Sequence, residues 1–565
     1  MSIDSFTHNT HIAYFSMEIA LRAEAHTYAG GLGVLAGDTV RSCADLELPV
    51  VFVTLISRAG YFRQEIDALG RQSEHEDAWK PEEWSEPLGV VIAVEIEKRE
   101  VWIRPRLYVH HCPLGNAIPV LLLDTNLDEN AEDDRKITDQ LYGGGGAYRL
   151  KQEIVLGVGG VRILQALGFS ITTYHLNEGH SALLTIELLR RFRRSPRRIA
   201  AGESAYDAAR VRDLCIFTTH TPVDAGHDRF PYDLVNRIMG NPIEGPELER
   251  LAGEDSLNMT RLALELSGYV NGVARRHAQT AARMYPGYQI KAITNGVHVA
   301  TWTHPSFAQL YHARFPHWSH EPECLICADQ LEDAAIWSAH AKAKRELLEL
   351  VRKETGVGTD PDWPVVVFAR RMTSYKRPML LFDDIDRLSR IAQQFPFQVV
   401  IAGKAHPRDT EGKQLIEKIY FQIRSLANRI PIAYVPNYDL EKARALVAGG
   451  DIWLNTPEPP LEASGTSGMK AALNGVLNLS APDGWWLEAC IEGVTGWSIG
   501  SGNVDGSWSA DARSLYDKLE SSILPLYSRD RARWIWMMKQ SISKIGSRFN
   551  SQRMMRRYAT EAYIR

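Results

Sequence analysis

The segment VVVFARRMTSYKRP, residues 365–378, joins a short apolar run to a basic turn. The run at residues 365–368 is apolar and β-branched, which is typical of a buried strand. Arg370 and Arg371 follow it, and Lys376 then begins an amphipathic pattern that predicts a helix with Leu380, Leu381, Ile385 and Leu388 on one face. A strand, a charged turn and a helix in this order are typical of a parallel α/β sheet.

Similar runs recur along the chain and alternate with amphipathic helical stretches. The candidate strands are residues 50–56, 118–123, 214–218, 365–368, 398–402 and 451–455. This alternation predicts an α/β fold with a mostly parallel sheet rather than a β-sandwich. Open α/β sheets bind ligands at the carboxyl ends of their strands, so functional residues are expected there.

The tract TNGVHVATWTH, residues 294–304, separates two parts of the chain, because helical periodicity resumes only near Leu331. We expect residues 1–300 and 301–530 to form two α/β domains that face a cleft. Residues 531–565 are predicted to form a helix that crosses back to the first domain. Its apolar side chains at helical spacing are Trp534, Met537, Met538, Ile542 and Ile545.

Composition excludes several classes of function. The 565 residues include 64 Lys and Arg against 69 Asp and Glu, a formal charge of −5, which predicts no binding to nucleic acid or to an anionic membrane. No run of eighteen apolar residues predicts a membrane helix. The six cysteines are too scattered for a disulfide framework, and the amino terminus lacks the pattern of a signal peptide. We therefore expect a cytoplasmic protein.

Adjacent glycines mark a second informative segment, AGGLGVLAGD at residues 29–38. The N–H groups of Gly30 and Gly31 could approach an anion at the positive end of a helix, which would make a phosphate cradle. A glycine turn that packs a helix against a strand explains the pattern equally well.

Arg371 and Lys376 are suited to a phosphate, since an arginine binds it through two N–H groups and a lysine supplies a compact charge. The alternative is a solvated, basic helix start. Cations at a helix N-terminus oppose the helix dipole, however, and this arrangement favours a compensating anion.

The third segment is PPLEASGTSGMK, residues 459–470, a Ser-, Gly- and Thr-rich turn that opens a helix. Its amides and hydroxyls could face an anion, and Lys470 lies in the first turns of the helix. A partly desolvated lysine can lose its charge and form an imine. The alternative is a capped helix with a solvent-exposed lysine.

Taken together, these segments resemble the α-glucan phosphorylases, the pyridoxal-phosphate-dependent relatives of glycogen phosphorylase, and in particular their shorter bacterial forms. The resemblance rests on EASGTSGMK and is reinforced by NEGHSALL (177–184), TTHTPVDAGHDRFP (218–231), TNGVH with Trp302, RRMTSYKRP, and PNYDL with Tyr438. It implies two Rossmann-like domains facing a cleft, the B-type glycosyltransferase architecture. The sequence departs from the long members at Glu178, where they carry Asp, and at Gly468, where they carry Asn.

The resemblance implies that Lys470 carries pyridoxal 5'-phosphate as a Schiff base, and that the cofactor's phosphate relays a proton to inorganic phosphate. The substrate phosphate would then protonate the departing glycosidic oxygen and attack the anomeric carbon with retention. The substrates would be an α-glucan and phosphate, and the product glucose 1-phosphate. The sequence leaves open whether identical subunits assemble.

The family's site residues fall on matching positions of this sequence. The catalytic set would be Lys470, Arg371, Lys376 and His220, with Arg371 and Lys376 holding the substrate phosphate. The cofactor would contact Arg370, Trp302, Tyr438, Gly465, Thr466 and Gly31. The glucosyl unit would contact Gly31, Leu32, His220, Asn295, Glu462, Ala463, Ser464 and Gly465. In relatives the backbone carbonyl at the His220 position stabilises positive charge on the sugar, so the imidazole need not act as a base.

Two other functions remain open. A nucleotide-sugar-dependent α-glucan synthase would share the architecture, the double glycine and the Arg-x4-Lys spacing, but it has no need for an imine-forming Lys470. A noncatalytic glucan-binding protein would not need Lys470, Arg371, Lys376, His220 and Glu462 together.

Several weaker motifs are interpreted conservatively. Cys324 and Cys327 form a lone CxxC without further ligands at a common zinc spacing, so we predict no metal site. The basic run at residues 190–198 is interpreted as solvated. The glycines at residues 143–146 are interpreted as mobile backbone at the cleft edge. His180 beside Glu178 fits either an acid/base pair or a structural hydrogen bond.

Overall fold

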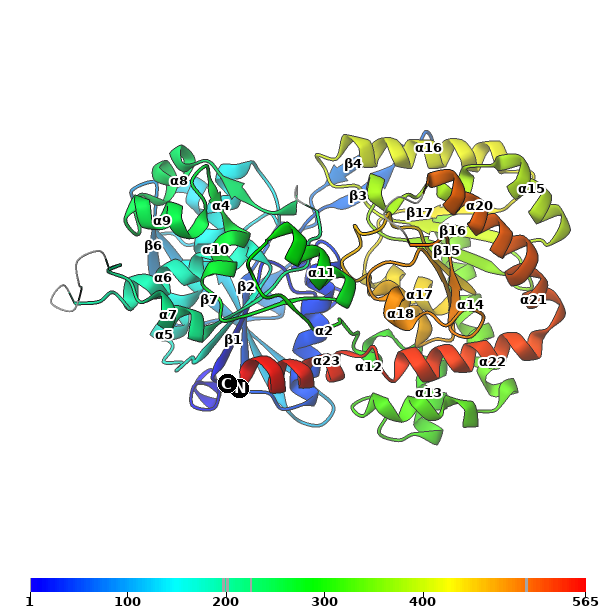
Figure 1. The fold of residues 1–565 in the computed structure, drawn as a ribbon, viewed down its shortest axis with the longest axis horizontal. Helices are drawn as coiled ribbons and strands as arrows, with labels where there is room; N and C mark the ends of the chain where they lie inside the picture. Colours follow the sequence, from blue (N-terminus) through cyan, green and yellow to red (C-terminus); the bar gives the residue numbers. More distant parts are fainter. Residues whose placement is uncertain (1, 196–198, 200–202, 224–225, 503–506, 565) are drawn as a thin grey trace.

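The computed structural model describes residues 2–195, 199, 203–223, 226–502 and 507–564. It contains two large, mainly parallel sheets, each covered by helices, in two lobes that lie side by side (Figure 1). The strands of the first sheet lie within residues 12–292, and those of the second lie within residues 365–498. The predicted α/β class with two Rossmann-like halves is confirmed. Among the described helices, none combines the length and the apolar character needed to cross a membrane.

The first sheet has the order β14–β13–β10–β9–β1–β2–β8–β7–β5, with β6 beside β7. Its strands are parallel from β14 to β8, and β7 runs antiparallel to β8. The strands are β1 (Ile12–Ser16), β2 (Val50–Leu55), β5 (Glu86–Pro87), β6 (Ile92–Ile96), β7 (Arg99–His111), β8 (Ala117–Asp124), β9 (Thr173–Asn177), β10 (Cys215–Thr218), β13 (Tyr269–Gly272) and β14 (Lys291–Ala292).

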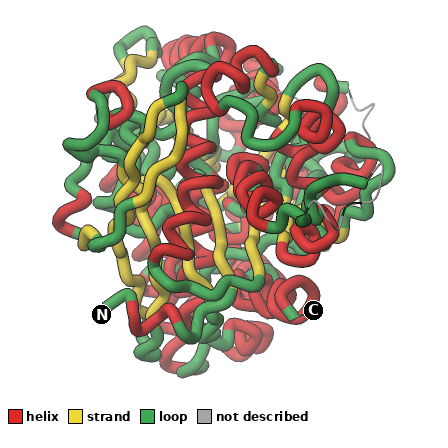
Figure 2. The backbone as a smooth tube through the Cα atoms, turned by 90° about the vertical axis from the view of Figure 1, so that its left-hand side faces the viewer, coloured by secondary structure: helices red, strands yellow, loops and turns green. Residues whose placement is uncertain are grey.

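Apolar residues cover both faces of this sheet. Tyr14 and Phe52 lie in one buried cluster, and Phe15 and Val53 lie in another, because successive side chains of a strand point to opposite faces. Figure 2, in which this lobe faces the viewer, shows its strands side by side with helices around them. The helices include α2 (Gly31–Asp45), α4 (Gly146–Ile154), α5 (Gly160–Ala166), α6 (Leu183–Arg191), α7 (Ala208–Leu214), α10 (Met259–Glu265) and α11 (Arg275–Met284).

The second sheet has six parallel strands in the order β17–β16–β15–β18–β19–β20. They are β15 (Val365–Ala369), β16 (Gln398–Ala402), β17 (Ile432–Val435), β18 (Ile452–Asn455), β19 (Leu477–Ser480) and β20 (Gly496–Ser498). Its helices include α14 (Asp333–Thr355), α15 (Ile385–Gln394), α16 (Thr410–Leu426), α17 (Leu440–Gly449) and α18 (Ser467–Ala472). All six strands predicted from the sequence are confirmed, as β2, β8, β10, β15, β16 and β18.

The helix predicted to begin at Lys376 is wrong. Lys376 ends a short 3₁₀ turn (Ser374–Lys376), a second turn follows at Leu380–Phe382, and α15 begins only at Ile385. Pro378 disfavours a helical conformation at the preceding residue, and Arg377 has a φ of +47°. Lys376 therefore lies in a loop whose shape is not set by helical spacing.

The C-terminal segment joins the two lobes. Helix α22 (Arg531–Ser541) packs with α14 of the second lobe, whereas α23 (Ser551–Tyr558) packs on α2 of the first. The two helices are separate because Asn550 interrupts them and caps α23 by accepting a hydrogen bond from the Arg553 amide. Val297 lies opposite Asn550, because the Val297 N–H donates to the Phe549 carbonyl and the Ser551 N–H donates to the Val297 carbonyl. The segment that leads from the first lobe to the second is therefore hydrogen-bonded to the chain between α22 and α23.

A hairpin from the first lobe lies against the second, as Figure 1 shows beside α16. It consists of β3 (Arg63–Ile66) and β4 (Gln72–His75). Gln64 donates a hydrogen bond to the carbonyl of Gly403 and exchanges two with Asn437, and Gln72 contacts the backbone of Ala405. The hairpin and the C-terminal segment therefore connect the lobes at two separate places.

We expect Gly296→Ala to destabilise the protein by about 1–3 kcal/mol or more, the usual cost of overpacking. A Cβ at this position would lie 2.1 Å from the carbonyl oxygen of Asn550, a contact that only backbone movement could relieve. Thermal unfolding measures the effect. Gly245→Ala is the control, because a Cβ there would meet nothing within 4 Å. Equal unfolding temperatures for the two variants would contradict the prediction.

Candidate functional site

Lys470 lies in α18, after the turn that follows β18, and it is only 7% exposed. Its Nζ atom is 3.8 Å from the centre of the ring of Trp302, which belongs to α12 (Val299–Trp302). Within the described part of the chain, no residue accepts a hydrogen bond from this ammonium group. The alternative of a solvent-exposed lysine is therefore wrong.

The environment of Lys470 favours loss of its proton. Burial lowers the pKa of Lys470 to about 8, although the negative charge of Asp38 acts in the opposite direction. An appreciable fraction of the amine is thus neutral near pH 7, and the neutral amine is the form that attacks a carbonyl group.

The turn before Lys470 presents backbone and hydroxyl groups. Gly465 has a φ of +80°, which residues with a Cβ rarely adopt, and the Ser464 hydroxyl is buried with no hydrogen-bond partner among the described residues. A Cβ on Gly468 would lie 2.2 Å from Asn478 Oδ1, so this position leaves no room for a larger side chain. Together with the first amides of α18, which include those following Thr466, the turn can hold an anion beside Lys470.

Arg370 and Lys376 follow the carboxyl end of β15 and share one carboxylate. Arg370 Nη2 and Lys376 Nζ each lie 2.5 Å from Glu462 Oε2. The Nε and Nη1 atoms of Arg370 are buried without an acceptor in the described residues, so most of this guanidinium is available to a ligand. Its charge also acts on Tyr438, which places that predicted residue close to Arg370.

Glu462 is 9% exposed and fully ionised at neutral pH. Burial alone would raise the pKa of Glu462, but the charges and hydrogen bonds of Lys376 and Arg370 outweigh it and hold the pKa at about 2. Ala463 follows Glu462 in the same turn, whose backbone is fixed by a hydrogen bond from the Glu462 amide to Asp483.

Arg371 reaches from the second lobe to the glycine loop of the first. A Cβ on Gly30 would lie 3.0 Å from Arg371 Nη2, so the missing side chain leaves room for the guanidinium. Arg371 forms no ion pair with any described carboxylate, and it stays exposed although it lies between the two lobes. Helix α2 begins at Gly31. The N–H groups of Gly31 and Leu32 therefore have no acceptor within the helix. An unpaired arginine and free helix amides thus meet at one place, as the phosphate-cradle interpretation requires.

His220 lies just beyond the carboxyl end of β10. Its Nε2 is 2.6 Å from Asn177 Oδ1, and its backbone N–H donates to Glu178 Oε2 over 2.7 Å. Burial, followed by the charges of His277, His175 and His180, lowers the pKa of His220 well below the usual value, so the imidazole is neutral. Asn177 therefore orients a ring that carries no charge.

Asn295 is held at the same edge of the first sheet. Its amide donates to the Val273 carbonyl, and its side-chain Oδ1 is buried with no partner in the described residues. No hydrogen bond joins Asn295 or His220 to Lys470. The structure thus joins Arg370 and Lys376 through Glu462 and brings Arg371 to Gly30.

His180 does not pair with Glu178 as an acid and base. Its Nε2 faces Asp228 at 3.6 Å, and its Nδ1 has no partner in the described residues. Burial lowers the pKa of His180 to about 3. Glu178 instead accepts hydrogen bonds from the amides of Gly179 and His220 and from the Thr221 hydroxyl, so it shapes the loop that carries His220.

Sequence reasoning missed two buried carboxylates. Glu18 follows β1 and accepts hydrogen bonds from the amides of Ala29 and Gly30 and from the Tyr142 hydroxyl. Asp38, on α2, accepts the indole N–H of Trp302. The position of Glu18 after a central strand could have identified it, whereas Asp38 needed the contact between the lobes.

The weaker motifs lie apart from the predicted site residues. Cys324 and Cys327 are free thiols in a 3₁₀ segment (Pro322–Gln330), and the described residues contain no group of three or more His, Cys, Asp or Glu side chains placed to hold a metal ion. In the basic run, Arg190 and Arg193 pair with Glu187 and Glu244, while residues 196–198 lie outside the described residues. The motif at residues 218–231 likewise includes residues 224–225, which are not described.

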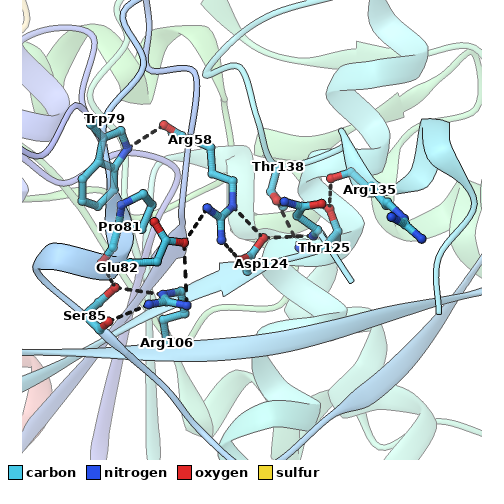
Figure 3. Close-up of polar contacts among 12 residues, drawn as sticks. Arg58, Trp79, Pro81, Glu82, Ser85, Arg106, Asp124, Thr125, Arg135 and Thr138 are labelled. Atoms are coloured by element: carbon cyan, nitrogen blue, oxygen red, sulfur yellow. Dashed lines mark hydrogen bonds and ion pairs between the residues drawn. The ribbon is translucent and has the colours of Figure 1, made fainter. Parts of the chain in front are cut away.

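Two cavities lie away from these residues. One, of about 440 Å³, is lined by Trp363, Phe395 and Tyr527 among others. The other, of about 330 Å³, includes Arg58 and Arg135 in its walls. Figure 3 shows that Arg58 is already engaged, because it pairs with Asp124 and Glu82. Arg135 donates hydrogen bonds to the backbone carbonyls of Asn130 and Asp128. Neither cavity contains a predicted site residue.

Known proteins resemble this chain over nearly its whole length. Residues 247–494 match the sequence family described as carbohydrate phosphorylase. Maltodextrin phosphorylase of Thermococcus litoralis is 39% identical over 98% of this chain and 70% of that protein. Glycogen phosphorylase of Mycobacterium tuberculosis is 36% identical over 98% and 71%, and that of Aquifex aeolicus is 33% identical over 99% and 86%.

The depressed pKa of Glu462 predicts how stability changes in acid. The ion pairs with Lys376 and Arg370 stabilise the folded state fully above pH 4.5, and this contribution is lost as the pH falls toward 2. Glu462→Gln should therefore be less stable than the natural chain at pH 6, and the difference should shrink between pH 4.5 and 2. Chemical denaturation at several pH values measures it. A difference that stays constant with pH would contradict the assigned ion pairs.

Proposed function

Since the chain belongs to the carbohydrate phosphorylase family, we propose that it is an α-glucan phosphorylase. It would transfer the non-reducing-end glucosyl unit of an α-1,4-glucan to inorganic phosphate with retention, giving glucose 1-phosphate. The observation that carries this proposal is the buried Lys470 of lowered pKa, which lies against the ring of Trp302 in the second lobe. The same lobe holds Arg370, a guanidinium that is largely without acceptors in the described residues. A nucleotide-sugar synthase or a noncatalytic protein has no use for this combination.

The residues around Lys470 fit pyridoxal 5'-phosphate. An enclosed, partly neutral amine suits its aldehyde, the face of Trp302 suits its ring, and the free N–H groups of Arg370 with the turn at Gly465 and Thr466 suit its phosphate. Tyr438 lies close enough to Arg370 to border the same place. When bound, the cofactor supplies a phosphate group that can exchange a proton with the substrate phosphate.

Arg371 and Lys376 would bind the substrate phosphate, with the Gly31 amide assisting from the first lobe. Two phosphates that face each other repel strongly, and close cationic groups offset that repulsion. Arg371 is suited to this role because it has no carboxylate partner in the described residues. Lys376 would exchange part of its contact with Glu462 for the incoming anion.

The glucosyl unit would bind between the lobes. Glu462 and the backbone at Ala463, Ser464 and Gly465 would hold it from the second lobe, while Leu32, His220 and Asn295 would hold it from the first. The neutral His220 ring supports a role for its backbone carbonyl rather than for a general base. The unpartnered Asn295 Oδ1 and Ser464 Oγ are available to sugar hydroxyl groups.

The relatives named maltodextrin phosphorylase and glycogen phosphorylase support linear or branched α-glucans as the donor class. We also propose that the enzyme works in the cytoplasm, where its six free cysteines would stay reduced.

Borohydride reduction followed by peptide mapping tests the cofactor assignment, together with a phosphate-dependent glucose 1-phosphate assay on maltooligosaccharides. We expect the reduced pyridoxyl label on Lys470, and we expect Lys470→Ala to lose both label and activity. Lys404, another lysine whose pKa burial lowers to about 8, is the matched control, and Lys404→Ala should keep the label. Unlabelled protein that extends glucans from a nucleotide sugar without phosphate would overturn the proposal.

Arg371→Ala should raise KM for phosphate by about 10- to 100-fold, the usual value of hydrogen bonds to a charged group. KM for the glucan should change much less, because Arg371 is assigned to the anion alone. Initial rates with each substrate varied separately measure the two constants. Arg58→Ala, which removes an arginine outside the site, is the control. Equal losses for both substrates in Arg371→Ala would contradict the assignment.

A further inference from the structure

Asp38 is a buried acid for which the proposed reaction has no use. It lies on α2, seven residues after Gly31 and therefore two turns below the start of that helix, and it is 1% exposed. Both of its oxygens accept the same indole N–H, at 3.0 and 2.9 Å from Trp302 Nε1. Burial of a carboxylate with a single neutral donor is costly, so nearby positive charge must stabilise it.

Two cations surround this carboxylate. Arg41 lies one turn further along α2, but its N–H groups donate to the carbonyls of Ala20 and Leu21. Lys470 approaches from the second lobe across the Trp302 ring, with its Nζ 3.8 Å from the ring centre. The order Asp38, indole, Lys470 thus links one helix of the first lobe to the residue proposed to hold the cofactor.

We propose that Asp38 is a positioning residue for Lys470, because it fixes the plane of the Trp302 indole, against whose face the amine lies until an aldehyde arrives. The inference rests on the proposed function, because it assigns Lys470 to the cofactor. Asp38 acts through two separable properties, a hydrogen-bond acceptor for the indole and a negative charge toward the amine.

Two substitutions of Asp38 separate these properties. Asp38→Asn keeps an acceptor for Trp302 but removes the charge, and Asp38→Ala removes both. Asp38 is the charged group that raises the pKa of Lys470 against burial, so its neutralisation should lower that pKa further. Asp45 is the control, since it is an acid of the same helix whose carboxylate is engaged by His298 and Gln552 instead.

The experiment uses the cofactor-free protein. It is labelled with trace acetic anhydride at pH values from 6 to 10, and peptide mapping measures the label on Lys470. We expect a midpoint near 8 in the natural chain. In Asp38→Asn we expect a midpoint lower by about half to one pH unit, which gives roughly 2.5- to 5.5-fold faster labelling at pH 7. Asp45→Asn should match the natural chain. Pyridoxal phosphate titration should show an affinity near that of the natural chain for Asp38→Asn and a weaker one for Asp38→Ala.

An unchanged or higher midpoint in Asp38→Asn, or equal cofactor affinity in Asp38→Ala and the natural chain, would overturn the inference. Circular dichroism checks the fold, and Asp38→Ser, a second neutral acceptor, replaces Asp38→Asn if that variant does not fold. Failure of the natural chain itself to bind pyridoxal phosphate would instead overturn the proposed function, so the two ideas fail separately.

Discussion

An excess of positive charge between the two sheets is the constraint on which the site depends. Arg370, Arg371 and Lys376 follow a single strand, and Glu462 is the carboxylate that Arg370 and Lys376 share, whereas Arg371 pairs with no described carboxylate. Enclosed cations that lack partners are costly unless an anion joins them. The neighbouring features meet this requirement: Gly30 has no side chain where Arg371 approaches, and α2 directs its first amides to the same region. The local structure is therefore organised around a ligand that carries negative charge.

Residues from both lobes form this region, so the relative position of the lobes must be held closely. The connection after β14 runs against the break between α22 and α23, where Gly296 leaves no space for a side chain beside Asn550. Far from this point, the β3–β4 hairpin reaches Gly403 and Ala405 of the second lobe. Because the lobes are attached at two separate places, one lobe cannot rotate freely against the other about either place alone. The two attachments stabilise the arrangement in which Arg371 can reach Gly30.

Most of the fold was predictable, because buried parallel strands are continuous apolar runs and such runs are local in sequence. The position of Arg370 and Arg371 just beyond the carboxyl end of β15 was predictable for the same reason. The loop after Arg371 was not, since apolar spacing suggested a helix where Pro378 prevents one. Asp38 and the β3–β4 hairpin escaped prediction because their roles depend on contacts between residues hundreds of positions apart, which no local pattern records.

The charges of the site divide into those that can change and those that cannot. Arginine stays protonated in proteins, so Arg370 and Arg371 are fixed cations, whereas Lys470 can release its proton because burial has lowered its pKa. Glu462 is the carboxylate that balances two of the cations. While it neutralises Lys376 and Arg370 its Oε2 atom is occupied, and an anion that took over these cations would free this oxygen to accept hydrogen bonds from hydroxyl groups. Under the proposed roles, anion binding and hydroxyl binding would favour each other, and by linkage the effect would be the same in both directions. A single shared carboxylate is enough to couple the two substrates that the proposed reaction brings together.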